Sequence, residues 1–372
     1  MEIYLDNAAT TRPNVKTAVL RHMEQAWYNP SAAYRQAEAV FKEIKQVRQR
    51  MCDAVRMNGT CIFTSGGTEA NNLALNSLSR RGAHIVVSAI EHPSIYETSR
   101  QLEQNGIRVD YVKPRGFCIN PEDVAALVTA DTAMVSVMHV NNETGALNDI
   151  AAIGRAVKEK NPKAFFHADG VQALLKTDVD LSSGYIDAYT VSAHKIHALK
   201  GTGALLVRQG VTVKPLLFGG GQESSLRPGT ENTLGILAFG EALETGIGKL
   251  GASIDNVRRL REAFIDGLRN IDGVTANIPD RFAPHIVSVS VAGVRGEVLA
   301  RAMGEKGVCI GTGAACSRGK LSRVLLECGV DRSLAEGAAR VSFCDENTME
   351  EITACLDVLE GTVKELRRFA RK

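Results

Sequence analysis

Short apolar runs alternate with longer segments of helical length between residues 60 and 210. Several of the runs are apolar at consecutive positions, a pattern typical of strands buried on both faces. Segments between them open with capping residues, such as Asp149 before the apolar positions of 150–153. The alternation predicts a mainly parallel sheet covered by helices. The predicted strands are 61–63, 85–87, 109–112, 133–138, 164–166, 188–191 and 204–207.

The pattern changes after about residue 250. Apolar side chains recur every three or four positions over 253–271, which predicts one buried face of a long helix. Over 287–291 valines alternate with serines, which predicts an antiparallel strand with one apolar and one polar face. A second apolar stripe over 349–366 predicts a last helix. We therefore expect a second, α+β unit that packs closely against the first, because no flexible linker separates them.

Composition excludes several classes of protein. The chain has 372 residues, and 44 Lys and Arg against 42 Asp and Glu leave a formal charge of +2. This balance lacks the basic field of nucleic-acid-binding proteins, so we expect no direct nucleic-acid partner. No apolar stretch approaches the ~18 residues that cross a membrane. The acidic start, residues 1–6, has no signal-peptide pattern, and we expect a cytoplasmic protein.

The eight cysteines form no C-x-x-C pair and have no histidine at zinc-finger spacing. Such spacings do not support a structural metal site, and we expect none. Without an export signal the thiols are expected to be reduced and mostly buried.

Two motifs follow predicted strands directly. Lys195 closes the segment 192–195 after strand 188–191. Open α/β sheets bind ligands at such strand ends, and a partly desolvated lysine there is able to form a Schiff base. The Gly-rich turn 65–69 follows strand 61–63 and opens a helix, so its backbone amides offer a cradle for a monophosphate. Taken singly, a surface lysine and an ordinary turn are the simpler explanations.

Two further polar residues stand at strand ends. His92 follows strand 85–87, where a flat imidazole is able to stack on a cofactor ring. Asp169 ends the strand before Gln172, and a carboxylate there keeps a pyridinium nitrogen protonated, as the electron sink of pyridoxal 5'-phosphate (PLP) requires. A loop imidazole and a helix N-cap would explain His92 and Asp169 singly. The four strand-end features have complementary roles, and together they favour a PLP site.

The sequence resembles the class V aminotransferase family of PLP enzymes, and most closely the cysteine desulfurases of the NifS/IscS type. The similarity covers nearly the whole chain. It implies the α/β fold of PLP fold-type I, with an aspartate-aminotransferase-like large domain over 16–250 and a smaller α+β domain over 1–15 and 251–372. The motifs that carry it are 4–11, 64–74, 139–145, 167–172, 192–195, 219–223, 227–230 and 313–317.

The resemblance implies a role for each residue around the cofactor. Lys195 binds PLP covalently and moves the substrate α-proton, while His92 stacks on the pyridine ring and takes part in proton transfer. Asp169 pairs with the ring nitrogen, and Gln172 hydrogen-bonds the phenolic oxygen. The phosphate is held by Gly67, Thr68, Ser192 and His194, and Thr230 reaches the phosphate of the neighbouring subunit in a homodimer.

The resemblance also implies the substrate and the nucleophile. Asn142 and Arg340 receive the carboxylate of L-cysteine, a task that suits a guanidinium fork. Cys316 takes the sulfur as a persulfide, L-alanine is released, and the sulfur passes to an acceptor protein of the Fe–S scaffold or tRNA-thiolation type. Cys316 stands in a Gly-rich segment with two nearby basic residues, a composition typical of an exposed loop that favours the thiolate.

Several positions depart from the family pattern. Tyr34 stands where a histidine is usual, and Ala198 and Leu199 replace the familiar Gly-Pro beyond Lys195. The segment after the nucleophile is also shorter than in the long-loop type. Cys344 replaces a small residue after the Arg340 motif. One hypothesis is that this cysteine relays or oxidatively caps the sulfur; a buried thiol behind the arginine is the simpler explanation.

Three other functions stay open at this point. A selenocysteine lyase or another class V aminotransferase-fold enzyme would use the same scaffold. A non-catalytic sulfur-relay scaffold would keep the fold alone, but such a protein has no need of Lys195, His92 and Asp169 together.

Overall fold

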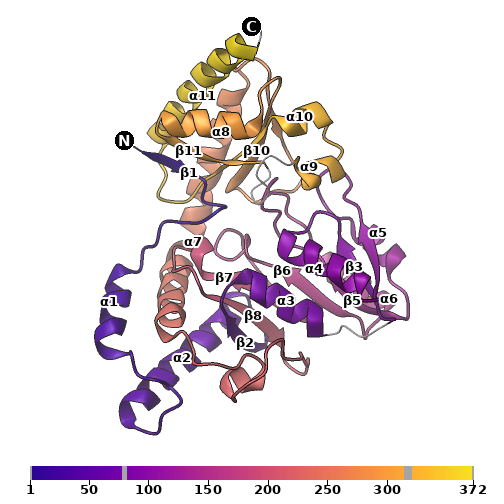
Figure 1. The fold of residues 1–372 in the computed structure, drawn as a ribbon, viewed down its shortest axis with the longest axis vertical. Coiled ribbons are helices and arrows are strands. Elements are labelled where there is room, and N and C mark those ends of the chain that lie inside the picture. The colour runs from indigo at the N-terminus through magenta and orange to yellow at the C-terminus, as the bar shows by residue number, and fades with distance from the viewer. Residues whose placement is uncertain (1, 78–81, 314–320, 371–372) are drawn as a thin grey trace.

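A computed structural model describes residues 2–77, 82–313 and 321–370. Within these ranges the strands form a seven-stranded sheet and a five-stranded sheet. The larger sheet lies in the lower half of the molecule in Figure 1, and the smaller sheet lies in the upper half.

The seven-stranded sheet is mainly parallel, as predicted. Strands β4, β3, β5, β6 and β7 pair in parallel, whereas β8 is antiparallel to both of its neighbours, β7 and β2. Each predicted run between residues 60 and 210 forms one of these strands. In order across the sheet they are β2 (Gly59–Thr64), β8 (Gly203–Arg208), β7 (Ala188–Ser192), β6 (Phe165–Asp169), β5 (Thr132–Ser136), β3 (His84–Ser88) and β4 (Arg108–Val112).

Helices cover both faces of this sheet because successive strand residues point to opposite sides. Ile85 and Val87 join a core with α3 (Gly67–Ser77) and α4 (Pro93–Gln104), whereas Val86 joins a core with helices of the other face. The helices of that second core are α2 (Arg35–Ala54), α6 (Ile150–Lys160) and the first half of α7 (Thr233–Leu268).

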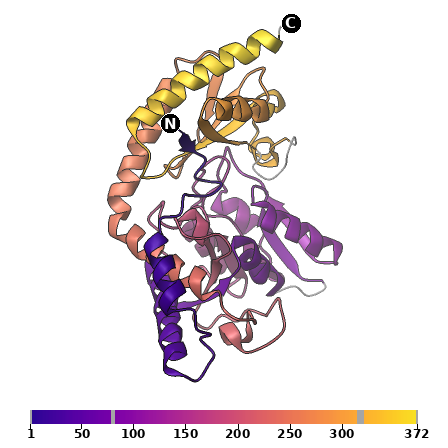
Figure 2. The same ribbon diagram turned by 60° about the vertical axis from the view of Figure 1, so that its left-hand side comes forward.

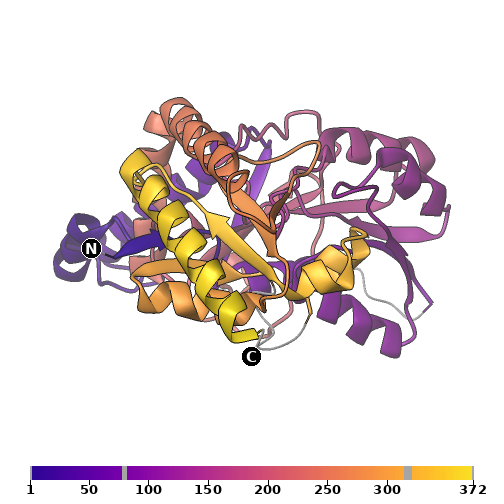
Figure 3. The same ribbon diagram turned by 90° about the horizontal axis from the view of Figure 1, so that it is seen from above.

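The five-stranded sheet has one β-strand from the start of the chain and four from its end. Its order is β1 (Ile3–Leu5), β11 (Val308–Thr312), β12 (Ala338–Ser342), β10 (Ile286–Val291) and β9 (Val274–Asn277). Helices α8 (Gly296–Glu305) and α11 (Met349–Ala370) contact each other over this sheet, as the view from above shows (Figure 3).

Strand β10 is antiparallel to both neighbours, as expected, but its second face is not solvated. Ser288 and Ser290 are fully buried, and both hydroxyls accept hydrogen bonds from Asn277 Nδ2, each at 3.0 Å. This face carries serines, as predicted, but it is buried. Asn277 supplies the hydrogen bonds that water would give to an exposed face.

Helix α7 runs through both halves of the molecule, along its left side in Figure 2. Its first half packs Ile236 and Phe239 into the core of the large sheet, and its second half packs Leu260 and Phe264 into the core of the small sheet. The predicted helix over 253–271 is only the second half of this element. The predicted division at 250/251 falls inside α7 and stays a prediction.

Four further α-helices complete the set in the described ranges. They are α1 (Lys16–Gln25), α5 (Pro121–Leu127), α9 (Arg323–Glu327) and α10 (Arg332–Glu336). No helix of the described ranges has the length and apolar character needed to cross a membrane.

Gly203, the first residue of β8, lies against the turn that leads into α3. A Cβ at this position would lie 2.5 Å from the carbonyl carbon of Gly66, closer than two such atoms approach. Only glycine lets the strand pass so near the Gly-rich turn. Gly248 in α7 is a matched contrast, because no atom outside its own helix backbone lies within 4 Å of a Cβ placed there.

We expect Gly203→Ala to lower the free energy of unfolding by about 1–3 kcal/mol, the usual cost of overpacking. Gly248→Ala should leave it unchanged or raise it by up to about 1 kcal/mol, because alanine is favoured inside a helix. Urea unfolding of the two variants beside the unsubstituted protein measures both changes. Equal stability of the two variants would contradict the close approach at Gly203.

Candidate active site

A cavity of about 300 Å³ lies where the parallel strands of the large sheet end, and β12 of the small sheet also reaches it. It brings together most of the residues that the sequence assigned to the site: Gly67, Thr68, His92, Asn142, Asp169, Gln172, Ser192, His194, Lys195 and Arg340. Thr230 is exposed and does not line the cavity. Cys316 lies outside the described residues.

One end of the cavity suits an anion. Gly67 is the first residue of α3, and a Cβ there would lie 2.9 Å from Val171 Cγ2, so the turn has room for glycine alone. Ser192 ends β7, and His194 follows in a 3-10 turn with Nδ1 at 3.1 Å from Thr10 Oγ1. Backbone N–H groups at a helix start attract phosphate, and hydroxyl and imidazole groups add further donors.

Asp169 is the last residue of β6 and is buried. Its Oδ1 accepts a hydrogen bond from the Val171 N–H at 2.9 Å, and its Oδ2 accepts one from Asn71 Nδ2 at 2.8 Å. Asn71 thus orients the carboxylate, and its own Oδ1 has no partner among the described residues. No sequence motif assigned a role to Asn71, although a polar residue on the buried face of α3 was an available signal.

His92 is the N-cap of α4 and also lines the cavity. Its Nδ1 accepts a hydrogen bond from the Ser94 N–H at 3.1 Å, so the neutral ring carries its proton on Nε2. Burial lowers the pKa of His92 from its ordinary value, against the opposing effect of Asp169. The imidazole is therefore mostly neutral, and the cap fixes both its tautomer and its position.

The amine of Lys195 is held by the start of the chain. Its Nζ donates hydrogen bonds to the carbonyls of Ala8 at 2.6 Å and Ala9 at 2.7 Å. Gln172 Nε2 donates to the same Ala8 carbonyl at 2.8 Å. Burial, followed by the positive charge of Arg340, lowers the pKa of Lys195 to about 7. An amine with a lone pair is thus accessible near neutral pH.

Arg340 lies on the opposite wall and is almost completely buried. Its Nη1 donates to the Asn142 carbonyl and its Nη2 donates to Asp6 Oδ1, both at 2.7 Å. Its Nε and Asn142 Oδ1 have no partner among the described residues. Because buried polar atoms are nearly always paired, these two atoms indicate room for a polar ligand beside the guanidinium.

The residues present fit PLP. The Gly67 turn would hold the phosphate, Asp169 would face the ring nitrogen, His92 would cover the ring, and Lys195 would supply the covalent link. The unpaired atoms of Arg340 and Asn142 mark where an amino acid carboxylate would bind.

The segment that begins at Leu321 is fixed beside the cavity. Ser322 Oγ donates to Glu143 Oε2 at 2.5 Å, and Glu143 follows Asn142 of the cavity wall. Arg323 donates to the carbonyls of Ala89 and Glu91, the residue before His92. The described residues on either side, β11 and the segment from Ser322, thus both border the site, since β11 pairs with β12.

The positions that depart from the family pattern lie outside the cavity. Tyr34 is exposed and packs edge-on against Tyr28. Ala198 is buried in the large core, with Leu199 packed against that core. Cys344 lines a second cavity, and burial raises the pKa of its thiol to about 11. A thiol that is rarely ionised and lies outside the catalytic cavity favours the explanation as a partly buried thiol over the relay hypothesis.

Glu143 predicts a pH dependence of stability. Burial raises the pKa of Glu143 from 4.5 to about 7. The folded state therefore binds this proton more tightly than the unfolded chain, and stability falls as the pH rises from about 4.5 to 7. Glu143→Gln keeps a neutral hydrogen-bonding side chain, so its melting temperature should fall less than that of the unsubstituted protein between pH 5 and pH 7.

Exposed Glu24, changed to Gln, is the control, and its melting curve should follow that of the unsubstituted protein across this range. Buried histidines with lowered pKa values, such as His139, contribute equally to all three proteins and cancel in the comparison. A Glu143→Gln profile parallel to that of the unsubstituted protein would contradict the assignment.

Comparisons with known proteins agree with this site. The profile of the family "Aminotransferase class-V" matches residues 3–355. "Cysteine desulfurase IscS" of Clostridium botulinum is 36% identical over 384 aligned positions, which cover 99% of this chain and 96% of that protein. A solved "NifS-like protein" superposes with a TM-score of 0.93 at 32% identity, covering 98% of this chain and all of the other.

A further solved structure, "SspA in complex with cysteine", has a TM-score of 0.80 at 28% identity and covers 94% of this chain and all of that one. Family, sequence relatives and fold thus point to the same group of enzymes, and their PLP chemistry is the one for which the cavity has the residues. The chain belongs to the class-V aminotransferase family of PLP-dependent enzymes, and within it to the cysteine desulfurases of the IscS/NifS type.

Proposed function

We propose that this protein removes sulfur from L-cysteine: the substrate and the Cys316 thiol give L-alanine and a Cys316 persulfide. The observation that carries the proposal is one cavity that is lined together by the Gly67 turn, Asp169, half-buried Lys195 and buried Arg340. PLP supplies an electron sink for the carbon skeleton of the amino acid when it is bound there.

The residues of this chain orient the two ligands. Gly67 and Ser192 would bind the phosphate with backbone and hydroxyl donors, and Asp169, held by Asn71, would keep the ring nitrogen protonated. Arg340 would bind the substrate carboxylate through N–H groups that its present partners leave free. Binding of the cofactor phosphate at one end and of the substrate carboxylate at the other would fix the position of the reacting carbon. This lowers the entropic cost of bringing the reacting groups together.

Proton transfer falls to Lys195 and His92. Lys195 Nζ takes the proton from the substrate Cα and returns a proton to the alanine skeleton, a task that an amine with a lowered pKa performs near neutral pH. His92 Nε2, free of hydrogen bonds to described residues, is the second group able to hold a proton at the cavity wall.

The sulfur step needs a nucleophile, which we assign to Cys316. Its thiolate attacks the substrate sulfur, an S–S bond forms, the substrate C–S bond breaks, and the electron pair of that bond stays with the substrate carbon. Cys316 is three residues beyond Gly313 and six before Ser322, which is bonded to Glu143 beside Asn142. The motif around Cys316 and the contact of Ser322 beside the cavity wall support this assignment.

The working form is proposed to be a homodimer. Large apolar side chains are exposed, among them Phe218 at 89% and Trp27 at 65%, and contact with a second copy would remove them from water. Thr230 is exposed and lies in the connection between β8 and α7 that also contains Phe218. Glu223 of this connection holds it against α2 through a bidentate ion pair with Arg48. A second copy would cover this surface and bring Thr230 to a phosphate, a contact that the chain does not make within itself.

The persulfide is proposed to pass to an acceptor protein, in Fe–S cluster biogenesis or tRNA thiolation, within the cytoplasm. In that transfer this chain supplies the sulfur donor, the Cys316 persulfide. The near-neutral overall charge of the chain does not favour direct binding of the tRNA itself.

We expect the PLP-loaded protein to release alanine from L-cysteine in the presence of a reductant, and Cys316→Ala to lose at least about a hundredfold of this rate, as the loss of a nucleophile does. Cys309→Ser, a change at a partly buried thiol of β11, is the control and should keep the rate. No alanine from any of the three, with PLP bound, would overturn the proposal. Faster turnover of selenocysteine that survives Cys316→Ala would indicate a selenocysteine lyase instead.

Thr230→Ala tests the contribution across the dimer. The variant should remain dimeric in sedimentation velocity yet release PLP faster during dialysis, because one phosphate contact is lost in each site. The unsubstituted protein sedimenting as a monomer, or Thr230→Ala retaining PLP unchanged, would contradict the shared site.

A further inference from the structure

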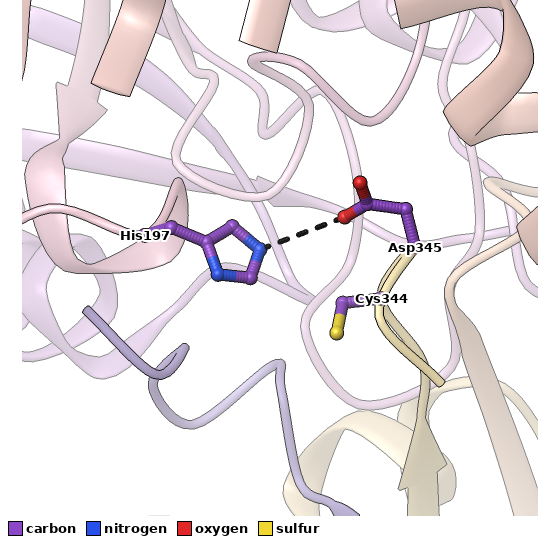
Figure 4. Close-up of side chains that lie close together, drawn as sticks. All are labelled: His197, Cys344 and Asp345. Carbon is purple, nitrogen blue, oxygen red and sulfur yellow. Dashed lines mark ion pairs between the residues drawn. The ribbon is translucent and has the colours of Figure 1, made fainter. Parts of the chain in front are cut away.

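A second cavity lies behind the lysine turn and shares Lys195 with the catalytic cavity. Its walls come from α7, from the turn after Lys195, and from the segment after β12. His197, Cys344 and Asp345 meet there, with one ligand atom of each lying within 4.8 Å of the others (Figure 4). Cys344 is one of the departures from the family pattern, and His197 stands beside another, Ala198.

His197 is oriented as a metal ligand. Its Nδ1 lies 3.0 Å from the Arg12 carbonyl, an acceptor only, so Nδ1 carries the proton and Nε2 keeps a lone pair. Its backbone N–H donates to Thr11 Oγ1 at 2.7 Å, and its carbonyl accepts from the Asn14 N–H at 2.8 Å. These bonds hold the residue at a left-handed φ of 67°. A ring N–H bonded to a carbonyl is the usual support of a metal-binding histidine.

Asp345 presents one free oxygen to this histidine. Lys249 Nζ holds Asp345 Oδ2 at 2.5 Å, and Oδ1 faces His197 Nε2 at 3.9 Å (Figure 4). This separation is too long for a hydrogen bond, and with the proton on Nδ1 both facing atoms are electron-pair donors. A cation or a water molecule between them would satisfy both lone pairs, and a cation would do so by coordination to each.

Cys344 completes a mixed set of ligands. Its sulfur lies within 4.8 Å of the ligand atoms of His197 and Asp345, and its backbone N–H donates to Asn347 Oδ1 at 2.8 Å, which fixes the turn after β12. One imidazole nitrogen, one sulfur and one carboxylate oxygen, with cavity space for a water molecule as fourth ligand, match the tetrahedral preference of Zn²⁺.

We propose that His197, Cys344 and Asp345 bind one zinc-type divalent cation, at a site separate from the PLP site. On binding, the metal–sulfur bond forms as the thiol proton leaves to the buffer, and no redox change occurs. The sequence spacing predicted no metal site because the ligands come from two segments far apart in the chain, and spacing rules detect only ligands close together.

The site would join the turn of Lys195 to the segment that follows Arg340. A bound ion therefore connects the two sheets behind the catalytic cavity. Lys176 lines the same cavity and interacts electrostatically with Cys344 and Asp345. Its positive charge opposes a cation, so removing it should strengthen metal binding.

The probe is Co²⁺, which is titrated into the PLP-loaded Cys316→Ala protein. This variant lacks the Cys316 thiol as a competing cobalt ligand. We expect one equivalent to give a thiolate-to-cobalt charge-transfer band in the difference spectrum and visible bands of tetrahedral cobalt, with Zn²⁺ displacing both. Cys344→Ser should abolish the charge-transfer band, and Asp345→Asn should weaken binding at least about tenfold. Cys309→Ser is the matched control and should leave the titration unchanged, while Lys176→Met should tighten it.

PLP absorbance and melting temperature verify that each variant is folded and loaded. If Cys344→Ser fails to fold, Asp345→Asn and Lys176→Met decide, because they should shift the affinity in opposite directions. A charge-transfer band that persists in Cys344→Ser, or no cobalt binding to the folded parent protein, would overturn the proposal.

Discussion

The stretch from Asp6 to Thr11 is the contact on which the rest of the site depends. It leaves the small sheet after β1 and crosses to the large sheet, and almost every residue in it holds a group of the cavity. Asp6 pairs with Arg340, and the carbonyls of Ala8 and Ala9 hold the Lys195 amine. Without this crossing segment the Lys195 amine would lose both of its carbonyl acceptors and Arg340 would lose its carboxylate partner, which is costly for groups enclosed by the protein.

The same segment also ties the two sheets together. Asn7 Nδ2 donates to the Ser342 carbonyl at 3.0 Å, and the Ala8 N–H donates to Ser342 Oγ at 2.9 Å. Thr11 Oγ1 donates to the carbonyl of His194 at 3.0 Å, on the other side of the cavity. Arg340 of β12 and the lysine turn of the large sheet are thus held at a fixed separation by one short peptide. Such fixation is what positions a reacting carbon between two binding groups.

Burial of several positive groups together sets the electrostatics. Arg340 and Lys176 both lower the pKa of Lys195, after the larger effect of burial. Asp6 and Asp169 oppose this effect on Lys195. Ligands that carry a phosphate and a carboxylate would balance these charges, so the cavity is suited to anions before any particular chemistry is considered. The polar atoms left unpaired at Arg340 and Asn142 are consistent with this.

Local patterning predicted the elements of the large sheet because a strand buried on both faces must be apolar at consecutive positions, as at 85–87. It placed Lys195, His92 and Asp169 in one site because the carboxyl ends of parallel strands meet at one edge. It failed where a distant residue changes the environment. Ser288 looked solvated until Asn277 was seen to pair with it, and Asn71 gained its role only from the approach of Asp169. No periodicity within one segment contains such information.

The two cavities cannot be independent, because Lys195 lines both and His197 follows it by two residues. A ligand that fixes His197 restricts the turn that carries the lysine, and occupancy of the lysine restricts the turn that carries His197. Gln172 adds a second connection, because its Oε1 lies 3.3 Å from Nε2 of His285, a wall residue of the second cavity. By thermodynamic linkage, if a ligand in one cavity changes the affinity of the other cavity for its ligand, the second ligand changes the affinity of the first cavity by the same factor. Of the departures from the family pattern, Cys344 lines the second cavity and Ala198 directly follows His197, so these two change the surroundings of the turn that carries Lys195.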